Sequence, residues 1–408
     1  MMVSKPAADI IKNLKILILG SGAGGNEVAK NAVLIGIRHM TIVDMDTVED
    51  SNLSKSVLFR KEDIGKGKAE VAAERLREMA LTDDPDIRFI NANLITDVGK
   101  GVFLEHDFVI IAFDTQEGRA YANDMCVLTG TPFMELGFRG YNVEISFFAP
   151  EGPMQQSDGT IIDSLPSSDG KFPKMLGKFP VCLREEIGTG SFDGARNSCS
   201  GFKVKDTDLA KIPSIQTSAA LSSALLIQEL VKYLDGKDTL RNKMLLFFGL
   251  TLQTMVISYT RRSDCTIHDQ TFNPVIVPVP RGVTIGEALR AIEGELGGEA
   301  ILSLPDEYIL SGKCHSCGKH IDINARSRQV WDEQRWCEEC RLAYPDYHLR
   351  LLHPNDLMKI PQEVSLRSPA NILEYRLRDA GVPENDILDC IILSDGEPQF
   401  YNVYLKTA

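Results

Sequence analysis

The sequence has no continuous apolar run long enough to cross a bilayer as a helix, so we expect no membrane span. The N-terminal segment also lacks the apolar stretch and small-residue cleavage site of a secretory signal, which predicts a cytoplasmic protein. Basic residues are in deficit, because 44 Lys and Arg face 57 Asp and Glu, a net charge of −13. This balance argues against sequence-independent nucleic-acid binding, which needs a basic surface, and leaves protein and nucleotide partners open.

Internal repeats and low-complexity tracts are also lacking. The 408 residues, 43% of them hydrophobic, are enough for two or three domains with a substantial core. The nine cysteines would allow disulfides in a secreted protein. Because two CxxC pairs account for four of them, metal binding is the better expectation in a cytoplasmic protein.

The N-terminal part alternates apolar strands with amphipathic helices. Strand-like runs occupy 15–19, 39–46, 86–94 and 107–114, and helical patterns occupy 26–37 and 65–80. Such alternation predicts an α/β fold with a Rossmann-like doubly wound parallel sheet, and 140–152 begins an antiparallel section.

Two domains are predicted. Residues 1–272 form the larger, α/β domain, whose segment 151–210 is rich in Gly, Ser, Asp and Lys and is expected to be a structureless crossover. A long, largely buried helix follows at 215–234. A proline-rich boundary then leads to a smaller α+β module at 273–408, with a zinc ribbon at about 310–345.

A glycine turn, Gly20-x-Gly22-x-x-Gly25, joins the first strand to the first helix. Glycines are needed where backbone approaches a phosphate closely, and alone this motif most often indicates NAD or FAD. The residues beyond the turn suit adenylation better, because that reaction needs an acid to hold Mg²⁺ and cations to balance a triphosphate. The candidates beyond the turn are the acids Asp44, Asp46 and Asp114, the amide Asn52 and the cation Lys68.

The segments DMDTVEDSNLSKSVLFRKEDIGKGKAEVAA and VIIAFDTQEGRAYAND resemble the ThiF/MoeB/HesA/ubiquitin-activating-enzyme family over about residues 10–270. The resemblance implies that the glycine turn and Lys68 contact the phosphates of ATP, that Asp46 binds ribose and that Asp114 helps to bind Mg·ATP. Asp44 and Asn52 complete the expected nucleotide site. The family usually has SNLxRQ, whereas here Lys55 stands at the arginine position; either it acts as a point charge or Arg60 takes over.

A thiol can capture the adenylated carboxyl as a thioester. Two cysteines are candidates: Cys182 in KFPVCLREE and Cys199 in RNSCSGF, each similar to a segment that bears the thiol in family members. A third possibility is that no cysteine is catalytic and that Cys182 is the relic of a metal ligand. Cys126 and Cys390 are expected in cores.

The two CxxC pairs near the C-terminus predict a zinc site. Cys314-x-x-Cys317 and Cys337-x-x-Cys340 have the spacing of a closed, structural four-thiolate site. Many relatives carry zinc elsewhere, between a CxxC near the crossover and a CxxC after the long helix. Here the second motif is Cys265-x-x-His268 and only Cys182 lies near the first, so we expect that site to be degraded or absent.

These observations predict an enzyme that adenylates the C-terminal carboxylate of a ubiquitin-like protein, forms a thioester and transfers it; the alternative is a sulfur-carrier adenylyltransferase. The expected cofactors are ATP, Mg²⁺ and Zn²⁺. By resemblance, a homodimer is expected, with the C-terminal module recruiting a carrier or a ubiquitin-conjugating-type enzyme. The rival hypotheses are adenylation of a peptide or a tRNA base precursor, an NAD- or FAD-dependent oxidoreductase, and a non-catalytic subunit.

Overall fold

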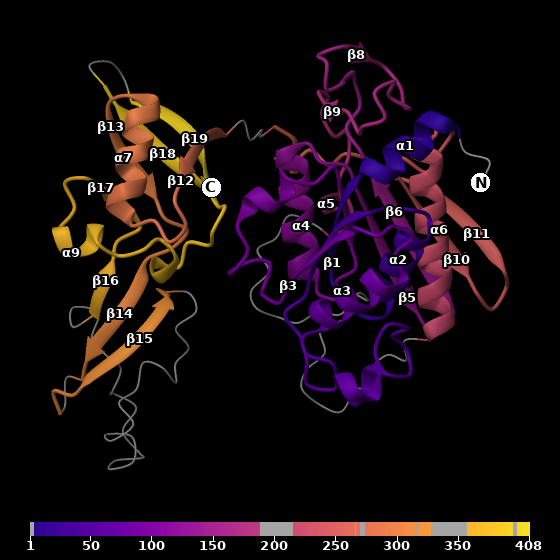
Figure 1. Ribbon diagram of the computed structural model, residues 1–408, viewed down its shortest axis with the longest axis horizontal. Helices are drawn as coiled ribbons and strands as arrows, with labels where there is room; N and C mark the ends of the chain where they lie inside the picture. The colour runs from indigo at the N-terminus through magenta and orange to yellow at the C-terminus, as the bar shows by residue number, and fades with distance from the viewer. Residues whose placement is uncertain are drawn as a thin grey trace. The chain divides into compact units, whose positions relative to one another are not determined.

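The computed structural model describes residues 4–187, 215–265, 267–269, 274–314, 317–327, 357–394 and 398–408. Contacts between residues divide the chain into two compact units (Figure 1). The first comprises Met1–Ile95 and Val102–Phe272, and the second Thr96–Gly101 and Asn273–Ala408. No helix within the described ranges is both long and apolar enough to cross a membrane.

The first unit is built on an eight-stranded sheet of order β11-β10-β6-β5-β4-β1-β2-β3. Five strands are parallel: β1 Lys15–Leu19, β2 His39–Val43, β3 Asp86–Ile90, β4 Phe108–Ile111 and β5 Phe133–Arg139. Three antiparallel strands extend it: β6 Asn142–Phe148, β10 Lys243–Phe248 and β11 Gln253–Ser258. The predicted Rossmann-like sheet with an antiparallel section is confirmed.

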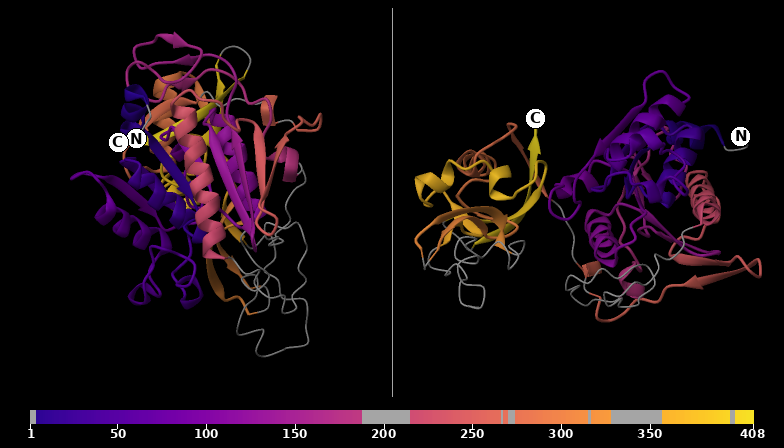
Figure 2. Two further views of the ribbon diagram at one scale, coloured as in Figure 1. Left: turned by 90° about the vertical axis from the view of Figure 1, so that its right-hand side faces the viewer. Right: turned by 90° about the horizontal axis from the view of Figure 1, so that it is seen from below.

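Helices cover both faces of this sheet. Ile16 and Ile18 of β1 belong to one core cluster with apolar residues of α1 Lys5–Asn13, α2 Ala23–Leu34, α3 Lys68–Met79 and α6 Gln216–Leu234. The alternate residues Leu17 and Leu19 are equally buried but lie outside that cluster, and α4 Gln116–Thr129 packs on β4. Because β1 is apolar on both faces, it occupies the middle of the sheet. Figures 1 and 2 show the long helix α6 lying against the antiparallel section.

The segment expected to be structureless from 151 has order up to the last described residue, 187, so that prediction is wrong there; 188–214 lie outside the described residues. Three short strands, β7 Met154–Gln155, β8 Ile161–Ile162 and β9 Lys174–Met175, form a small separate sheet. Asp169 stabilises the connecting loop by accepting hydrogen bonds from Ser157 and from the Lys171 N–H. The Ser157 hydroxyl, followed by these N–H groups, lowers the pKa of Asp169 to about 2. The short helix α5 Arg184–Ile187 ends the segment.

The second unit contains two sheets. The larger has the order β12-β19-β18-β13-β17 and comprises β12 Val275–Val279, β13 Glu299–Ser303, β17 Glu363–Ser365, β18 Ile387–Leu393 and β19 Gln399–Thr407. The smaller has the order β15-β14-β16 and comprises β14 Tyr308–Lys313, β15 His320–Arg326 and β16 Leu357–Ile360. Helix α7 Ile285–Leu296 begins at a capping box between Thr284 and Glu287 and buries its apolar face on the larger sheet.

Short helical turns complete the two units. They are η1 Asp50–Asn52, η2 Lys61–Asp63, η3 Lys100–Phe103, η4 Ile267–Asp269, α9 Ala370–Leu373 and η8 Arg378–Ala380.

The glycine turn after β1 is as tight as its sequence predicts. A Cβ atom on Gly25 would lie 2.0 Å from the carbonyl oxygen of Gly20, and one on Gly20 would lie 2.7 Å from that of Ala112. Gly20 also has φ +100°, which favours glycine. The β1–α2 turn therefore contacts the β4–α4 turn with no room for a side chain between them.

We predict that Gly25→Ala lowers the free energy of unfolding by about 1–3 kcal/mol, because the added methyl forces two backbone segments apart. Gly137→Ala in β5 is the matched control, since its Cβ would meet only Glu144 Cβ at an ordinary 3.7 Å. Denaturant-induced unfolding measures both variants. Equal stability of the two would contradict the close approach.

Candidate functional site

The glycine turn lies at the switch point of the sheet. In the order β3-β2-β1-β4-β5 the connections from β1 lead to one side and those from β4 to the other. Open α/β sheets bind ligands at the carboxyl ends of the strands that flank this point. Gly22 is the N-cap of α2, so the first N–H groups of that helix face the same edge, where they favour an anion such as phosphate.

Asp44 follows β2 and connects two loops of this edge. One carboxylate oxygen accepts a hydrogen bond from Ser21 N–H at 2.6 Å, and the other accepts one from Asp46 N–H at 2.8 Å. Burial raises the pKa of Asp44, although these two hydrogen bonds oppose the shift. Because both oxygens are already bonded, Asp44 positions the glycine turn, and Asp46 is the acid whose side chain extends outward.

Asp46 and Lys68 form an ion pair beside the turn. Lys68 Nζ lies 2.8 Å from Asp46 Oδ2, and the Lys68 N–H donates to the Asp46 carbonyl at 2.9 Å. The Asp46 side chain is 57% exposed, whereas that of Lys68 is 13% exposed. Lys68 begins α3, and its own carbonyl accepts from the Ser21 hydroxyl at 3.4 Å. One cation and one accessible carboxylate thus lie next to the glycine turn.

The loop after β2 carries the remaining predicted contacts. Asn52 is buried, and its amide oxygen accepts from the Glu49 N–H at 3.0 Å, which stabilises η1. The guanidinium of Arg60 donates to the carbonyls of Val57 and Phe59, each at 2.9 Å. Since Arg60 is bonded within its own loop, half-buried Lys55 is the better candidate for the cation of this loop.

Asp114 lies on the β4–α4 turn, the turn that contacts Gly20 through Ala112. Its side chain is exposed, and Thr115 directly after it caps α4 by accepting from the Gly118 N–H at 3.3 Å. The structure therefore brings most of the predicted nucleotide residues to one edge of the sheet. They are Gly20, Gly22, Gly25, Asp44, Asp46, Lys68 and Asp114.

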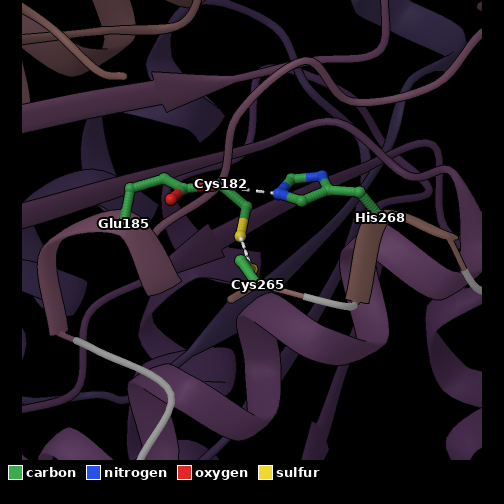
Figure 3. Close-up of side chains that lie close together, drawn as sticks. All are labelled: Cys182, Glu185, Cys265 and His268. Atoms are coloured by element: carbon green, nitrogen blue, oxygen red, sulfur yellow. Dashed lines mark hydrogen bonds and ion pairs between the residues drawn. The ribbon is translucent and has the colours of Figure 1, made fainter. Parts of the chain in front are cut away.

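A second cluster joins Cys182, Glu185, Cys265 and His268 (Figure 3). One ligand atom from each residue lies within 4.8 Å of all the others. The two sulfur atoms are 4.0 Å apart, and His268 Nε2 lies 3.1 Å from a carboxylate oxygen of Glu185. Cys182 is 0% exposed, Cys265 3% and His268 4%, so the cluster is closed to solvent.

These distances fit a tetrahedral Zn²⁺. Zinc–sulfur bonds of about 2.3 Å place two sulfur ligands about 3.8 Å apart, and bonds of about 2.0–2.2 Å place a nitrogen and an oxygen about 3.4 Å apart. Thiolate, imidazole and carboxylate are all zinc ligands, so the donor set fits as well.

The surroundings of the two thiols also suit a metal ion. Backbone N–H groups of Arg184 and Ile267 donate to the sulfur atoms of Cys182 and Cys265, respectively, each two residues further along the chain. The Asn123 amide donates to Cys182 at 3.6 Å. Burial nevertheless raises the pKa of both thiols, so a divalent cation would be needed to hold them as thiolates at neutral pH.

The structure therefore gives Cys265-x-x-His268 a neighbouring pair, Cys182 and Glu185, that the sequence did not lead us to expect. Glu185 is the residue that sequence reasoning missed, because the search was for a second cysteine. The available signal was the equal spacing of Cys182-x-x-Glu185 and Cys265-x-x-His268. Cys182, the first candidate for the acyl acceptor, lies inside this cluster and not on an accessible surface.

The predicted zinc ribbon is described in part. Cys314 directly follows β14, and its carbonyl accepts from the Gly318 N–H while its N–H donates to the Lys319 carbonyl, both at 2.8 Å. Gly318 has φ +73°, as a tight turn between Cys314 and β15 requires. Cys317 is exposed. Cys337, Cys340 and the alternative acyl acceptor Cys199 lie outside the described residues.

Among curated proteins, SUMO-activating enzyme subunit 2 of Dictyostelium discoideum is 34% identical over 139 residues, 34% of this chain and 21% of that protein. The NEDD8-activating enzyme E1 catalytic subunit of Caenorhabditis elegans is 35% identical over 117 residues, 29% of this chain and 26% of that protein. The chain thus matches about a quarter or less of these relatives' lengths.

Among solved structures, that of E. coli MccB with ATP is 17% identical with a TM-score of 0.47, covering 64% of this chain and 68% of the other. The model of the ThiF family matches residues 1–267, which include the glycine turn, Lys68, Asp114 and Cys182. The chain is therefore a member of the ThiF family.

Proposed function

We propose that this protein uses Mg·ATP to adenylate the C-terminal carboxylate of a ubiquitin-like or sulfur-carrier protein. The observation that carries the proposal is the placement of Lys68 and Asp114 beside a phosphate-type glycine turn, at the switch point of the sheet. Membership of the ThiF family supports it, as do relatives named as SUMO- and NEDD8-activating enzyme subunits.

Each residue of the edge then has a role. The N–H groups at the start of α2 and the Lys68 ammonium bind the phosphates, Lys55 adds a second cation, and Asp46 accepts from the ribose. Asp44 holds the glycine turn against the Asp46 loop. Asn52 stabilises that loop by accepting a hydrogen bond from the Glu49 N–H. Asp114 is the carboxylate that would hold Mg²⁺, which neutralises the charge that develops on the departing pyrophosphate. The carrier's carboxylate attacks the α-phosphorus, forming an acyl-AMP and releasing pyrophosphate.

We predict that Lys68→Ala lowers carrier-dependent ATP–pyrophosphate exchange by about 100-fold, because a cation aimed at the developing charge is lost. We expect Asp114→Ala to lower the exchange rate by at least the same factor. Lys66→Ala is the matched control, since that ammonium is half-exposed and pairs with Asp63 at 3.3 Å. Equal rates for Lys68→Ala and Lys66→Ala, or no exchange by the wild-type protein with any candidate carrier, would overturn the proposal.

The metal proposal is two zinc ions in each chain. Cys182, Glu185, Cys265 and His268 would hold one, and Cys314, Cys317, Cys337 and Cys340 the other. The distances of the first cluster and the glycine-containing turn at Cys314 support these assignments. Both would be closed sites that stabilise the fold without binding substrate.

We predict that mass spectrometry of the metal content finds about two zinc ions per chain in the wild-type protein and about one in Cys265→Ser and in Cys314→Ser. Cys126→Ser is the control, because it alters a fully buried thiol of α4 that belongs to no described metal cluster. A Cys265→Ser variant that keeps the full zinc content would refute the first site.

If Cys182 is a metal ligand, Cys199 is the remaining candidate for the acyl acceptor. Its thiolate would attack the carbonyl of the acyl-AMP, form the thioester and release AMP. We predict that Cys199→Ala still exchanges pyrophosphate but forms no adduct with the carrier that thiols can cleave, as seen on non-reducing gels. An adduct that survives in Cys199→Ala and vanishes in a zinc-replete Cys182→Ala would reverse this assignment.

The partner proposals rest on the resemblance. We propose that two chains pair as a homodimer and that the second unit recruits the carrier or a conjugating-type enzyme. The presence of two sheets around a core of its own in that unit is compatible with a separate binding module.

A further inference from the structure

The buried cluster contains one thiol in each of its two motifs. Cys182 and Cys265 are 83 residues apart in the chain, and their sulfur atoms lie 4.0 Å apart. A disulfide needs about 2.05 Å, so the two sulfurs have only about 2 Å to close. A site built from two CxxC motifs could form a disulfide inside each motif. Here the two motifs offer only the bond that joins one to the other.

The other two ligands form a complementary pair of their own. His268 Nε2 lies 3.1 Å from Glu185, and their side chains are only 1% and 2% exposed. Without a metal ion, the His268 imidazole nitrogen and the Glu185 carboxylate remain within hydrogen-bond distance of each other. The Arg262 N–H already donates to the second oxygen of Glu185 at 2.8 Å. With the two sulfurs bonded, each of the four side chains would therefore have a partner without a metal ion.

We propose that Cys182 and Cys265 form a reversible disulfide when a peroxide oxidises the site, so that a covalent bond replaces the metal as the link between the two segments. The inference deepens the proposed function in one respect, because it assigns the redox behaviour of the proposed zinc ligands. The segments that contain Cys182 and Cys265 stay joined in both states.

The chemistry balances with hydrogen peroxide as the oxidant. The Cys265 thiolate attacks one peroxide oxygen, giving a sulfenic acid and hydroxide; the Cys182 thiolate then attacks that sulfur and displaces a second hydroxide. Two thiolates lose two electrons in total, two protons convert the hydroxides to water, and a bound zinc ion is released because disulfide sulfurs are poor ligands. Cys265 is the thiol that reacts first, because it is 3% exposed whereas Cys182 is 0% exposed.

The test treats the full-length, zinc-loaded protein with one equivalent of hydrogen peroxide and digests it with trypsin without reduction. We expect FPVCLR, residues 179–184, to be joined to SDCTIHDQTFNPVIVPVPR, residues 263–281, two mass units below the sum of the two thiol peptides. A chromophoric zinc chelator should record about one zinc released per chain, and dithiothreitol with zinc should restore the starting state.

Two variants are compared with the wild type for formation of the linked peptide. Cys126→Ser should form the linked peptide as the wild type does, whereas Glu185→Gln keeps both thiols, weakens the metal site and should form it at least as fast. Sulfinic acid at Cys265 with no linked peptide in wild type and Glu185→Gln would overturn the proposal. A protein that starts without zinc yet forms the linked peptide would refute the metal assignment alone. Pyrophosphate exchange, measured separately, reports on adenylation and on neither of these.

Discussion

The edge of the sheet that carries the predicted nucleotide residues depends on one steric constraint, the contact of backbone with backbone where β1 ends. Gly25 lies so close to the Gly20 carbonyl, and Gly20 so close to that of Ala112, that neither position has space for a side chain. This contact brings the turns after β1 and β4 together at the switch point. Asp44 then ties the third loop to them through two N–H groups, so the positions of Asp46, Lys68 and Asp114 all depend on it.

Helix α4 connects this edge to the cysteine cluster. It begins directly after Asp114 and Thr115, and further along it Asn123 donates to the Cys182 sulfur and accepts from the Leu183 N–H at 2.8 Å. The neighbouring Asp124 accepts from the Arg184 guanidinium. Asp114 lies just before the start of α4, and the buried Asn123 lies further along it. Because a helix is rigid, hydrogen bonds that hold Asn123 in place also hold the start of the helix in place. A well-ordered cluster therefore helps to fix the turn that carries Asp114.

The sequence was informative wherever a pattern is local. The strand–turn–helix run from 15 to 34 can be derived from periodicity and glycine spacing, and the structure places it as expected. The roles expected for the loop from 44 to 68 came from the family resemblance. Strand β5 was missed because Glu135 and Gly137 interrupt its apolar run, and the partner of Glu135 is Arg119 on α4. The order in 154–175 was missed because it depends on side-chain hydrogen bonds of Asp169 and Gln156. Both omissions concern contacts between distant residues.

The cysteine cluster shows the same limit in chemical form. A search for cysteine pairs finds the motif at 314–317 and overlooks Cys182-x-x-Glu185, although a metal ion requires only a donor atom of suitable charge at the right distance. The set of two cysteines, a glutamate and a histidine differs in one respect from a set of four cysteines. Two thiols with a carboxylate and an imidazole give one sulfur pair that joins distant parts of the chain and one buried carboxylate–imidazole pair. A glutamate and a histidine in place of two cysteines therefore keep four donor atoms together while leaving only one pair of sulfur atoms that a disulfide could join.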